Sequence, residues 1–425
     1  MRRIRKWLVG SDRNISRRNI IWNMLGSTFY AFATLLLTTV TGNVAGESAG
    51  GVFSFAFAIG QQLLSVSYFG VRPYHQTDVA GRYAFQEYFH VRIATCLFSA
   101  AAGIVYLLVS DFTAAKAAVV FLLICFKMAD GFADVYEIEF QRQDRLYMAG
   151  KSMFFRTLLS VTAYIVALLL TRSLIPACAA AVLAAAAGVV IFDMVPGGFF
   201  RYIRRPDWRK GFMLLRECVL IFLASFMEYY ILNASKFAIE AHVNDSAVYC
   251  YTVIFLPNMV INLVAGYIIR PFLTGMVVKW ERRQRRRFAA GIFKIFAIIA
   301  AFAALAQILG YTLGTPVLNL ISGANVSSYR GALLLLVAGG SLYAGETLLY
   351  YVLVIFRRQK SLFVLYGIVF LAALAVTGPL VRTHGIMGGA AAYFLMMALL
   401  FLLFGGYAAF CFAADFRNQK RKSNR

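Results

Sequence analysis

The sequence predicts an all-α membrane protein of about 12 transmembrane helices, arranged as two pseudo-symmetric six-helix bundles around a central cavity. Three observations lead to this prediction: the composition, the apolar runs, and the placement of charge between them. Of 425 residues, 61% are hydrophobic and only 14% are charged, and the mean hydropathy is +0.70. A chain this apolar is expected to be surrounded by lipid, so soluble classes of protein are excluded.

The apolar runs have the length that a bilayer requires. A helix needs about 20 apolar residues to cross the hydrocarbon core. The first half of the chain holds six such runs, at residues 20–40, 51–68, 93–109, 117–136, 154–170 and 178–195. The second half holds six more, at residues 212–232, 248–269, 292–313, 333–356, 362–380 and 386–410.

The basic residues between these runs fall almost entirely on one side of the predicted membrane. The opposite side carries only Lys116, Arg172, Lys236, Arg330 and Arg382. The positive-inside rule therefore places both termini in the cytoplasm. The net charge of +23 is then explained by topology and by contact with anionic membrane lipids, so we expect no nucleic-acid partner.

The two halves resemble each other. Residues 52–55 can be laid over residues 248–251, and the following loops begin with Arg72-Pro73 and Arg270-Pro271. Two parallel copies of a six-helix unit can enclose a cavity and rock against each other to give alternating access. The predicted domains are a basic amphipathic cytoplasmic segment (1–19), a first bundle (20–200), a basic cytoplasmic linker (201–211), a second bundle (212–412) and a basic cytoplasmic tail (413–425).

Ionisable residues inside the predicted spans are the candidate functional residues, because each is costly to place in lipid. Lys127, Asp130 and Asp134 share one face of the fourth span at spacings of three and four residues. One interpretation is a cavity face, in which a carboxylate carries a coupling ion and the lysine meets an anionic group. The other is a structural cluster that neutralises itself.

The seventh span is also unusually polar. It carries Arg216 and Glu228, followed by Asn233 and Lys236 at neighbouring positions of one face. These side chains would line a cavity, or the outer end of the helix is simply wetted by water. Glu346 stands alone near the middle of the tenth span.

Arg72 and Arg270 lie where the second and eighth spans end. A guanidinium group binds phosphate through paired donors, so both could meet a phosphate that enters from the cytoplasmic leaflet. The alternative is that both are ordinary flanking charges of the positive-inside kind.

Three stretches resemble a known superfamily: NIIWNMLGS at residues 19–27, AGGVFS at 49–54 and NASKFAI at 233–239. Across essentially its whole length the chain resembles the multidrug/oligosaccharidyl-lipid/polysaccharide exporter superfamily, and within it the O-antigen and capsular polysaccharide flippases. The resemblance implies two six-helix bundles in a bacterial cytoplasmic membrane. It also implies transport of a lipid-linked (undecaprenyl-pyrophosphate) oligosaccharide repeat unit by alternating access, for cell-surface polysaccharide biosynthesis.

The resemblance suggests roles for these residues. Members of this family are thought to meet the pyrophosphate and sugar acids with cationic cavity residues, although the basic position after Asn233 is lysine here where arginine is common. The substrate-binding candidates are Lys127, Lys236, Asn233, Arg72, Arg270 and Arg216, and the ion-coupling candidates are Asp130, Asp134, Glu228 and Glu346. A polysaccharide polymerase and glycosyltransferases are the expected partners.

Two other functions stay open. An ion-coupled multidrug exporter of the same fold would favour an acidic, aromatic cavity, which the four carboxylates allow. A membrane glycosyltransferase or polymerase would need a large polar loop with acid and base residues, and the sequence has none. We therefore expect no enzyme activity, cofactor or metal.

Overall fold

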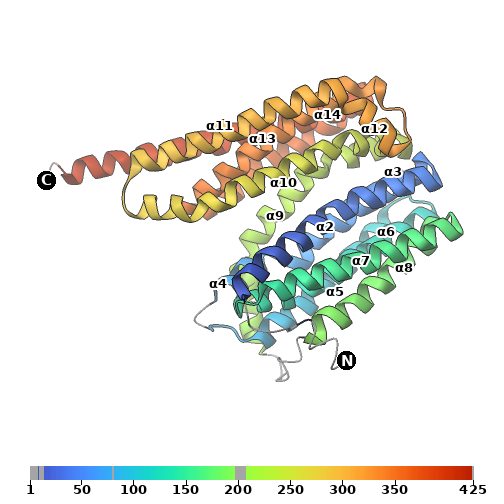
Figure 1. Cartoon of the computed structure of the whole chain (residues 1–425), viewed down its shortest axis with the longest axis horizontal. Helices are drawn as coiled ribbons and strands as arrows, with labels where there is room; N and C mark the ends of the chain where they lie inside the picture. Colours follow the sequence, from blue (N-terminus) through green and yellow to red (C-terminus); the bar gives the residue numbers. More distant parts are fainter. Residues whose placement is uncertain (1–7, 9–13, 79–80, 197–206, 424–425) are drawn as a thin grey trace. The chain divides into compact units, whose positions relative to one another are not determined.

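The computed structural model describes residue 8 and residues 14–78, 81–196 and 207–423 (Figure 1). All regular secondary structure in these ranges is helical. Most of the predicted amphipathic segment at residues 1–19, and residues 201–206 of the predicted linker, lie outside the described residues. Contacts divide the chain into two compact units, Met1–Tyr229 and Tyr230–Arg425.

The described part of the first unit contains six complete long helices and the first part of a seventh, α9 (Trp208–His242). The six complete helices are α2 (Ile15–Ala45), α3 (Glu47–Tyr68), α5 (Phe85–Val109), α6 (Ala114–Arg142), α7 (Leu146–Thr171) and α8 (Leu174–Gly188), and α8 continues as the π-helix η1 (Val189–Met194). The short helix α4 (Val71–Thr77) follows α3. Helix α2 packs along α7, α3 packs on α5 and α6, and α8 packs on α6 and α7.

Glycine allows α2 and α7 to approach closely. Gly26 of α2 and Gly150 of α7 lie where a Cβ atom would overlap the backbone of the other helix. Small residues serve this purpose in membranes, where helices associate through packing and not through exclusion of water. This contact fixes α7 against α2, and α7 carries a central residue of the site described below.

Helix α9 (Trp208–His242) contains the division between the two units. The second unit continues with α10 (Asp245–Glu281), α11 (Arg285–Leu309), η3 (Gly310–Gly314), α12 (Thr315–Ser322), η4 (Ser327–Tyr329), α13 (Arg330–Ile355) and α14 (Gln359–Ser423). Helix α13 packs along α14 and on α10 and α11. Gly385 has φ 53° and ψ −129°, so α14 consists of two helices that join there.

Each predicted apolar run coincides with a described helix. Nine helical segments of the described chain are long and apolar enough to cross a membrane, and one of them, Lys360–Asp415, is long enough to cross twice. Helices α6 and α9 complete the set of twelve crossings; they have the length, but they carry several charged residues. The predicted all-helical membrane fold is thus confirmed.

Apolar and charged side chains are distributed as lipid requires. Leucines such as Leu108, Leu170 and Leu320 are at least 80% exposed and face outward. Several charged residues of the helices turn inward instead; Lys127, Asp134 and Glu346 are almost completely buried. Charges within a membrane are expected to face the interior of a bundle in this way.

Candidate functional site

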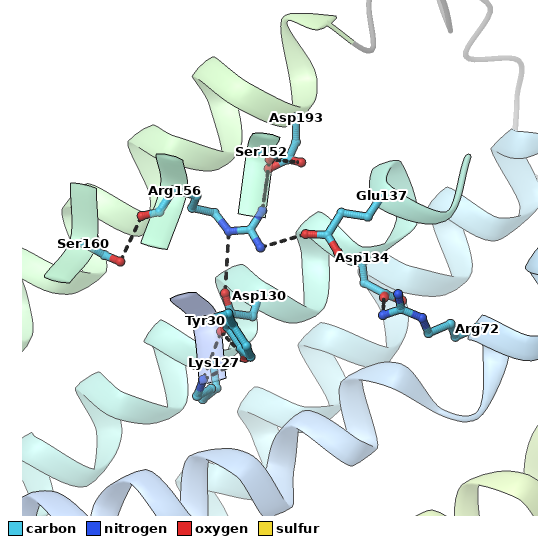
Figure 2. A network of polar contacts seen from close by, with 10 residues as sticks. All are labelled: Tyr30, Arg72, Lys127, Asp130, Asp134, Glu137, Ser152, Arg156, Ser160 and Asp193. Carbon is cyan, nitrogen blue, oxygen red and sulfur yellow. Dashed lines mark hydrogen bonds and ion pairs between the residues drawn. The ribbon is translucent and has the colours of Figure 1, made fainter. Parts of the chain in front are cut away.

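Eight charged side chains of the first unit gather around helix α6 in two neighbouring groups of ion pairs, which we call the network (Figure 2). Lys127, Asp130, Asp134 and Glu137 follow one another on one side of α6, and none is more than 7% exposed. Their spacing of three or four residues brings successive side chains onto one face of the helix. The neighbouring helices supply the partners of this face.

Lys127 is held by a carboxylate and a phenol. Its Nζ lies 3.1 Å from Oδ2 of Asp130 and 3.0 Å from the hydroxyl oxygen of Tyr30, on α2. Tyr30 in turn donates to the same Asp130 oxygen at 3.0 Å. The ammonium group also lies 4.4 Å from the ring centroid of Phe57. The three polar groups therefore satisfy one another.

Arg156 on α7 is the centre of the network. Its Nη2 donates to Oε1 of Glu137 at 2.9 Å, and its Nη1 donates to Oδ2 of Asp193 at 2.8 Å. Its Nε lies 3.6 Å from Oδ1 of Asp130. Asp193 also accepts a hydrogen bond from Ser152. One guanidinium group thus joins three carboxylates from two different elements.

The backbone around Arg156 makes room for this arrangement. Asp193 lies in the π-helix η1, whose wider turn changes the direction in which the side chain points. Gly188, at the end of α8, lies where a Cβ atom would overlap the Arg156 side chain. A π-helical turn within an apolar helix is often found at functional sites.

Asp134 forms a second branch of the network. It accepts a hydrogen bond from Arg72 of α4 at 2.5 Å and one from Arg92 of α5 at 2.7 Å. Arg92 also donates to the backbone oxygen of Ser67 at 2.6 Å and is 1% exposed. The side chain of Arg72 remains 38% exposed. Each oxygen of Asp134 is therefore bound by one guanidinium group.

The charges in the network balance. Four bases (Arg72, Arg92, Lys127 and Arg156) face four acids (Asp130, Asp134, Glu137 and Asp193). The sequence alone singled out four of these eight residues, namely Arg72 and the three residues of α6, Lys127, Asp130 and Asp134. A cavity of about 10 Å³ lies beside Tyr30, Lys127, Asp130 and Arg156, which is room for about one water molecule.

The second unit buries its charge differently. Lys236 of α9 is 8% exposed. Within the part of the chain that the structure describes, its ammonium group has no hydrogen-bond acceptor and no carboxylate at ion-pair distance. Its printed neighbour is the ring of Phe255 on α10, whose centroid lies 5.6 Å from Nζ.

Further polar atoms without partners among the described residues lie on the helices around Phe255. Phe255 packs edge-on against Tyr393 of α14, with ring centroids 5.0 Å apart. Asn258 is one turn from Phe255 on α10, and it lies where a Cβ on Gly340 of α13 would overlap it. Both amide atoms of Asn258 and the hydroxyl of Tyr393 are buried without a hydrogen bond to a described residue. Helices α9, α10 and α14 thus place a cation, an amide and a phenol around Phe255.

The remaining candidate residues have fewer contacts with Lys236 or with the network. Asn233 is buried one turn from Lys236, Glu228 is half-buried and Arg216 is exposed. Glu346 is 1% exposed and accepts a hydrogen bond from Tyr366 at 3.1 Å. The side chain of Arg270 lies outside the part of the chain that the structure describes. Among the described residues, no group of His, Cys, Asp and Glu could hold a metal ion.

Sequence reasoning missed four members of the network. Arg92, Arg156, Glu137 and Asp193 were not among the candidates. Arg156 and Asp193 each lie within a predicted apolar run, and a lone charge in such a run is itself a signal of a functional or paired residue. Glu137 and Arg92 fall at or just beyond the limits of their runs, where charge is ordinary.

No protein-family model and no curated protein matches the sequence. Solved structures do match. A multidrug resistance transporter of the MATE family, of the MOP superfamily, in an inward-facing conformation has a TM-score of 0.66 and 12% identity, over 91% of this chain and 94% of that one. The MATE multidrug transporter DinF-BH has a TM-score of 0.65 and 14% identity, over 93% of this chain and 95% of that one.

A MOP superfamily transporter from Pyrococcus furiosus is similar as well, with a TM-score of 0.52 and 13% identity. The match covers 96% of this chain and 98% of that chain. That protein is described by a reverse polarity of its binding pocket, which suggests a different function for it. Together with the membrane-length helices, these likenesses establish that this protein is a multi-pass membrane protein with the fold of the MOP superfamily transporters.

Proposed function

We propose that this protein is a flippase, which carries a lipid-linked (undecaprenyl-pyrophosphate) oligosaccharide across a bacterial cytoplasmic membrane by alternating access, for cell-surface polysaccharide biosynthesis. The observation that carries this proposal is Lys236, a buried cation in a membrane helix with no carboxylate partner among the described residues. A charge held in this way costs several kcal/mol when nothing compensates it. An anionic substrate would supply the missing partner.

The surroundings of Lys236 suit a glycan joined to a phosphate. Phe255 and Tyr393 offer aromatic surfaces, and Asn258 and Tyr393 offer unpaired donors and acceptors to sugar hydroxyl groups. Polar groups left unpaired in a dry interior are costly, and a ligand that satisfies them gains that free energy. Asn233 lies next to Lys236 on α9 and is proposed to act with it.

The buried network of the first unit would serve the coupling of transport to an ion. Asp130 and Asp134 each touch two cationic groups, so a change in the charge of either carboxylate would unbalance its partners. Glu228 and Glu346 are proposed as further coupling groups in α9 and α13. Arg72 would present its exposed guanidinium edge to a headgroup, with Arg216 and Arg270 as further basic positions.

The alternative is an ion-coupled multidrug exporter, which the names of the similar structures favour. An exporter of organic cations would be opposed by the unpaired charge of Lys236, because like charges repel in a medium of low dielectric constant. The protein from Pyrococcus furiosus offers a parallel, since a pocket of reversed polarity has been described within this fold.

The test uses purified protein in liposomes. If Lys236 binds the anionic headgroup, the protein should move a fluorescent pyrophosphate-linked oligosaccharide lipid across the liposome membrane. It should not drive the accumulation of a cationic dye along an ion gradient. In cells, disruption of the gene would leave lipid-linked oligosaccharide on the cytoplasmic leaflet, where the glycosyltransferases build it and the polymerase cannot reach it. If these cells had normal surface polysaccharide and reduced dye efflux, the flippase proposal would be wrong and the exporter would be the better assignment.

A further inference from the structure

A separate cationic pocket lies where α10 and α13 end and α11 begins. Its volume is about 450 Å³, and its lining includes Val277, Trp280, Arg283, Arg285, Phe356 and Arg357. We call it the arginine pocket. All of its lining residues belong to the second unit, and they lie on the side that the charge distribution predicts as cytoplasmic.

Arg285 is held rigidly in this pocket. Its guanidinium carbon lies 3.4 Å from the ring centroid of Trp280, and its Nη1 donates to the Trp280 backbone oxygen at 2.7 Å. Its Nη2 lies 2.7 Å from Oδ2 of Asp415. The Nε–H group is buried and has no hydrogen-bond partner among the described residues. The pocket lining therefore contains one arginine whose position is fixed by its neighbours.

Arg283 and Arg357 occupy equivalent positions in two turns. Each follows the end of its helix with φ near 58°, and in both turns the next residue donates its backbone N–H five residues back, to Lys279 and to Leu353. The left-handed conformation is the one that glycine usually supplies at such helix ends. Both side chains are exposed, and neither has an ion pair within the described residues.

The lining combines these charges with apolar walls. Three arginines face Glu281 and Asp415, so the pocket keeps a positive excess. Val277, Val354 and Ile355 form its apolar side, and Trp280 packs at a tilt against Phe356 with ring centroids 4.2 Å apart. The first backbone N–H groups of α11 lie at Arg285, and the start of a helix favours an anion.

We infer that the arginine pocket binds the phosphoryl headgroup of an anionic phospholipid, with an acyl chain against its apolar side. Guanidinium groups bind phosphate oxygens through paired donors, which matches the exposed Arg283 and Arg357, while Arg285 adds a fixed positive charge beside them. A soluble phosphate would use the arginines but not the valine and isoleucine walls. The inference does not depend on the transported substrate, so it stands apart from the proposed function.

Trp280 provides the probe for a test. The full-length protein is placed in nanodiscs of phosphatidylcholine that contain the same fraction of either brominated phosphatidylglycerol or brominated phosphatidylcholine. Bromine quenches tryptophan on contact, and the signal of Trp280 is the part lost in Trp280→Phe. We expect the anionic bromolipid to quench Trp280 far more strongly than the neutral one.

The control variants separate a site from general attraction. Arg283→Ala with Arg357→Ala should lower the preference for the anionic lipid at least about tenfold, because the pair removes the charge-assisted hydrogen bonds to the phosphate. Arg286→Ala with Arg287→Ala removes the same charge from exposed residues outside the lining and should leave the preference intact. An equal loss in both pairs would overturn the inference. Displacement of the bromolipid by dissolved pyrophosphate as effectively as by phosphatidylglycerol would also overturn it, because the site would then take free phosphate.

Discussion

The two units of this protein bury their charges in opposite ways. The first unit encloses a network of four bases and four acids, in which each charge contacts an opposite charge. The second unit buries Lys236 against an aromatic ring, and Glu346 accepts a hydrogen bond from a tyrosine. The first unit thus holds charges that are already paired, whereas the second unit holds a buried charge without an opposite charge among the described residues.

This contrast separates stability from function. Removing one member of a buried ion pair leaves its partner uncompensated, and such losses are large. An isolated buried charge already destabilises the fold. Its removal should therefore leave the stability unchanged or raise it, and should weaken only the binding of the ligand that contacts the charge. Substitutions in the two units should therefore move stability and transport in different directions.

The largest effect is expected at Arg156. Replacing it with methionine (Arg156→Met) leaves Glu137 and Asp193 buried without their common cation, which should lower the free energy of unfolding by about 3–5 kcal/mol. Thermal unfolding of the purified protein in detergent measures the loss. Arg286→Met, at an exposed arginine, is the control. If both variants unfold at the temperature of the wild type, the network does not hold the first unit together.

Lys236→Met tests the other side of the comparison. It should leave the thermal stability unchanged or raise it, while translocation of the pyrophosphate-linked lipid falls about 10- to 100-fold, the equivalent of about 1.5–3 kcal/mol for a hydrogen bond to a charged group. Lys236→Arg keeps the charge and should retain most of the activity. Marked destabilisation by Lys236→Met would mean that the lysine is a structural residue with an unrecognised partner.

A double-mutant cycle at Lys127 and Asp130 measures how much free energy their ion pair contributes to the stability of the first unit. Lys127→Met and Asp130→Asn should each destabilise the first unit, because each leaves a charge or a hydrogen bond of the Tyr30 cluster unmatched. The double variant should lose less than the sum of the two, with a coupling of about 0.5–3 kcal/mol. Strict additivity would show that the contact carries no net free energy.

Sequence patterns were sufficient for the helices and insufficient for the partners. The twelve runs were found because lipid imposes a fixed length and an apolar composition on each crossing. The α6 stripe of Lys127, Asp130 and Asp134 was found because helical spacing is a local property. Which helix faces that stripe depends on packing, so Arg156 on α7 and Asp193 on η1 could not be paired with it from the sequence.

Residues near helix ends show the same limit. Arg92 has the spacing of an ordinary cytoplasmic flank, yet it is buried, because α5 begins at Phe85 and Arg92 faces Asp134 within the bundle. Lys236 was counted among the outer loop charges as well as among the substrate-binding candidates. Its burial follows from the extension of α9 to His242, ten residues beyond the predicted run at 212–232.

The smallest expected effect concerns His75, in α4 outside the predicted spans. The ring is fully buried, stacks on Tyr88 at 3.9 Å, and places Nε2 2.9 Å from Oε2 of Glu139, while Nδ1 has no hydrogen-bond partner among the described residues. Burial lowers the pKa of His75 below its ordinary value of 6.5, although the hydrogen bond to Glu139 partly opposes this shift. The folded protein therefore keeps this histidine neutral to a lower pH than the unfolded chain does.

Because the unfolded chain binds more protons in this range, stability should fall as the pH drops below the unfolded value of about 6.5, by at most about 1.4 kcal/mol per pH unit. His75→Phe keeps the stacking on Tyr88 and should remove this slope, which melting curves between about pH 7.5 and 5.5 would measure. For Glu139, burial would raise the pKa, but the hydrogen bonds from His75 and Arg142 lower it, so its contribution is lost only below its ordinary value of 4.5. A slope that persists in His75→Phe would place the titrating group elsewhere. The pH dependence of stability would then arise from a titratable group other than His75.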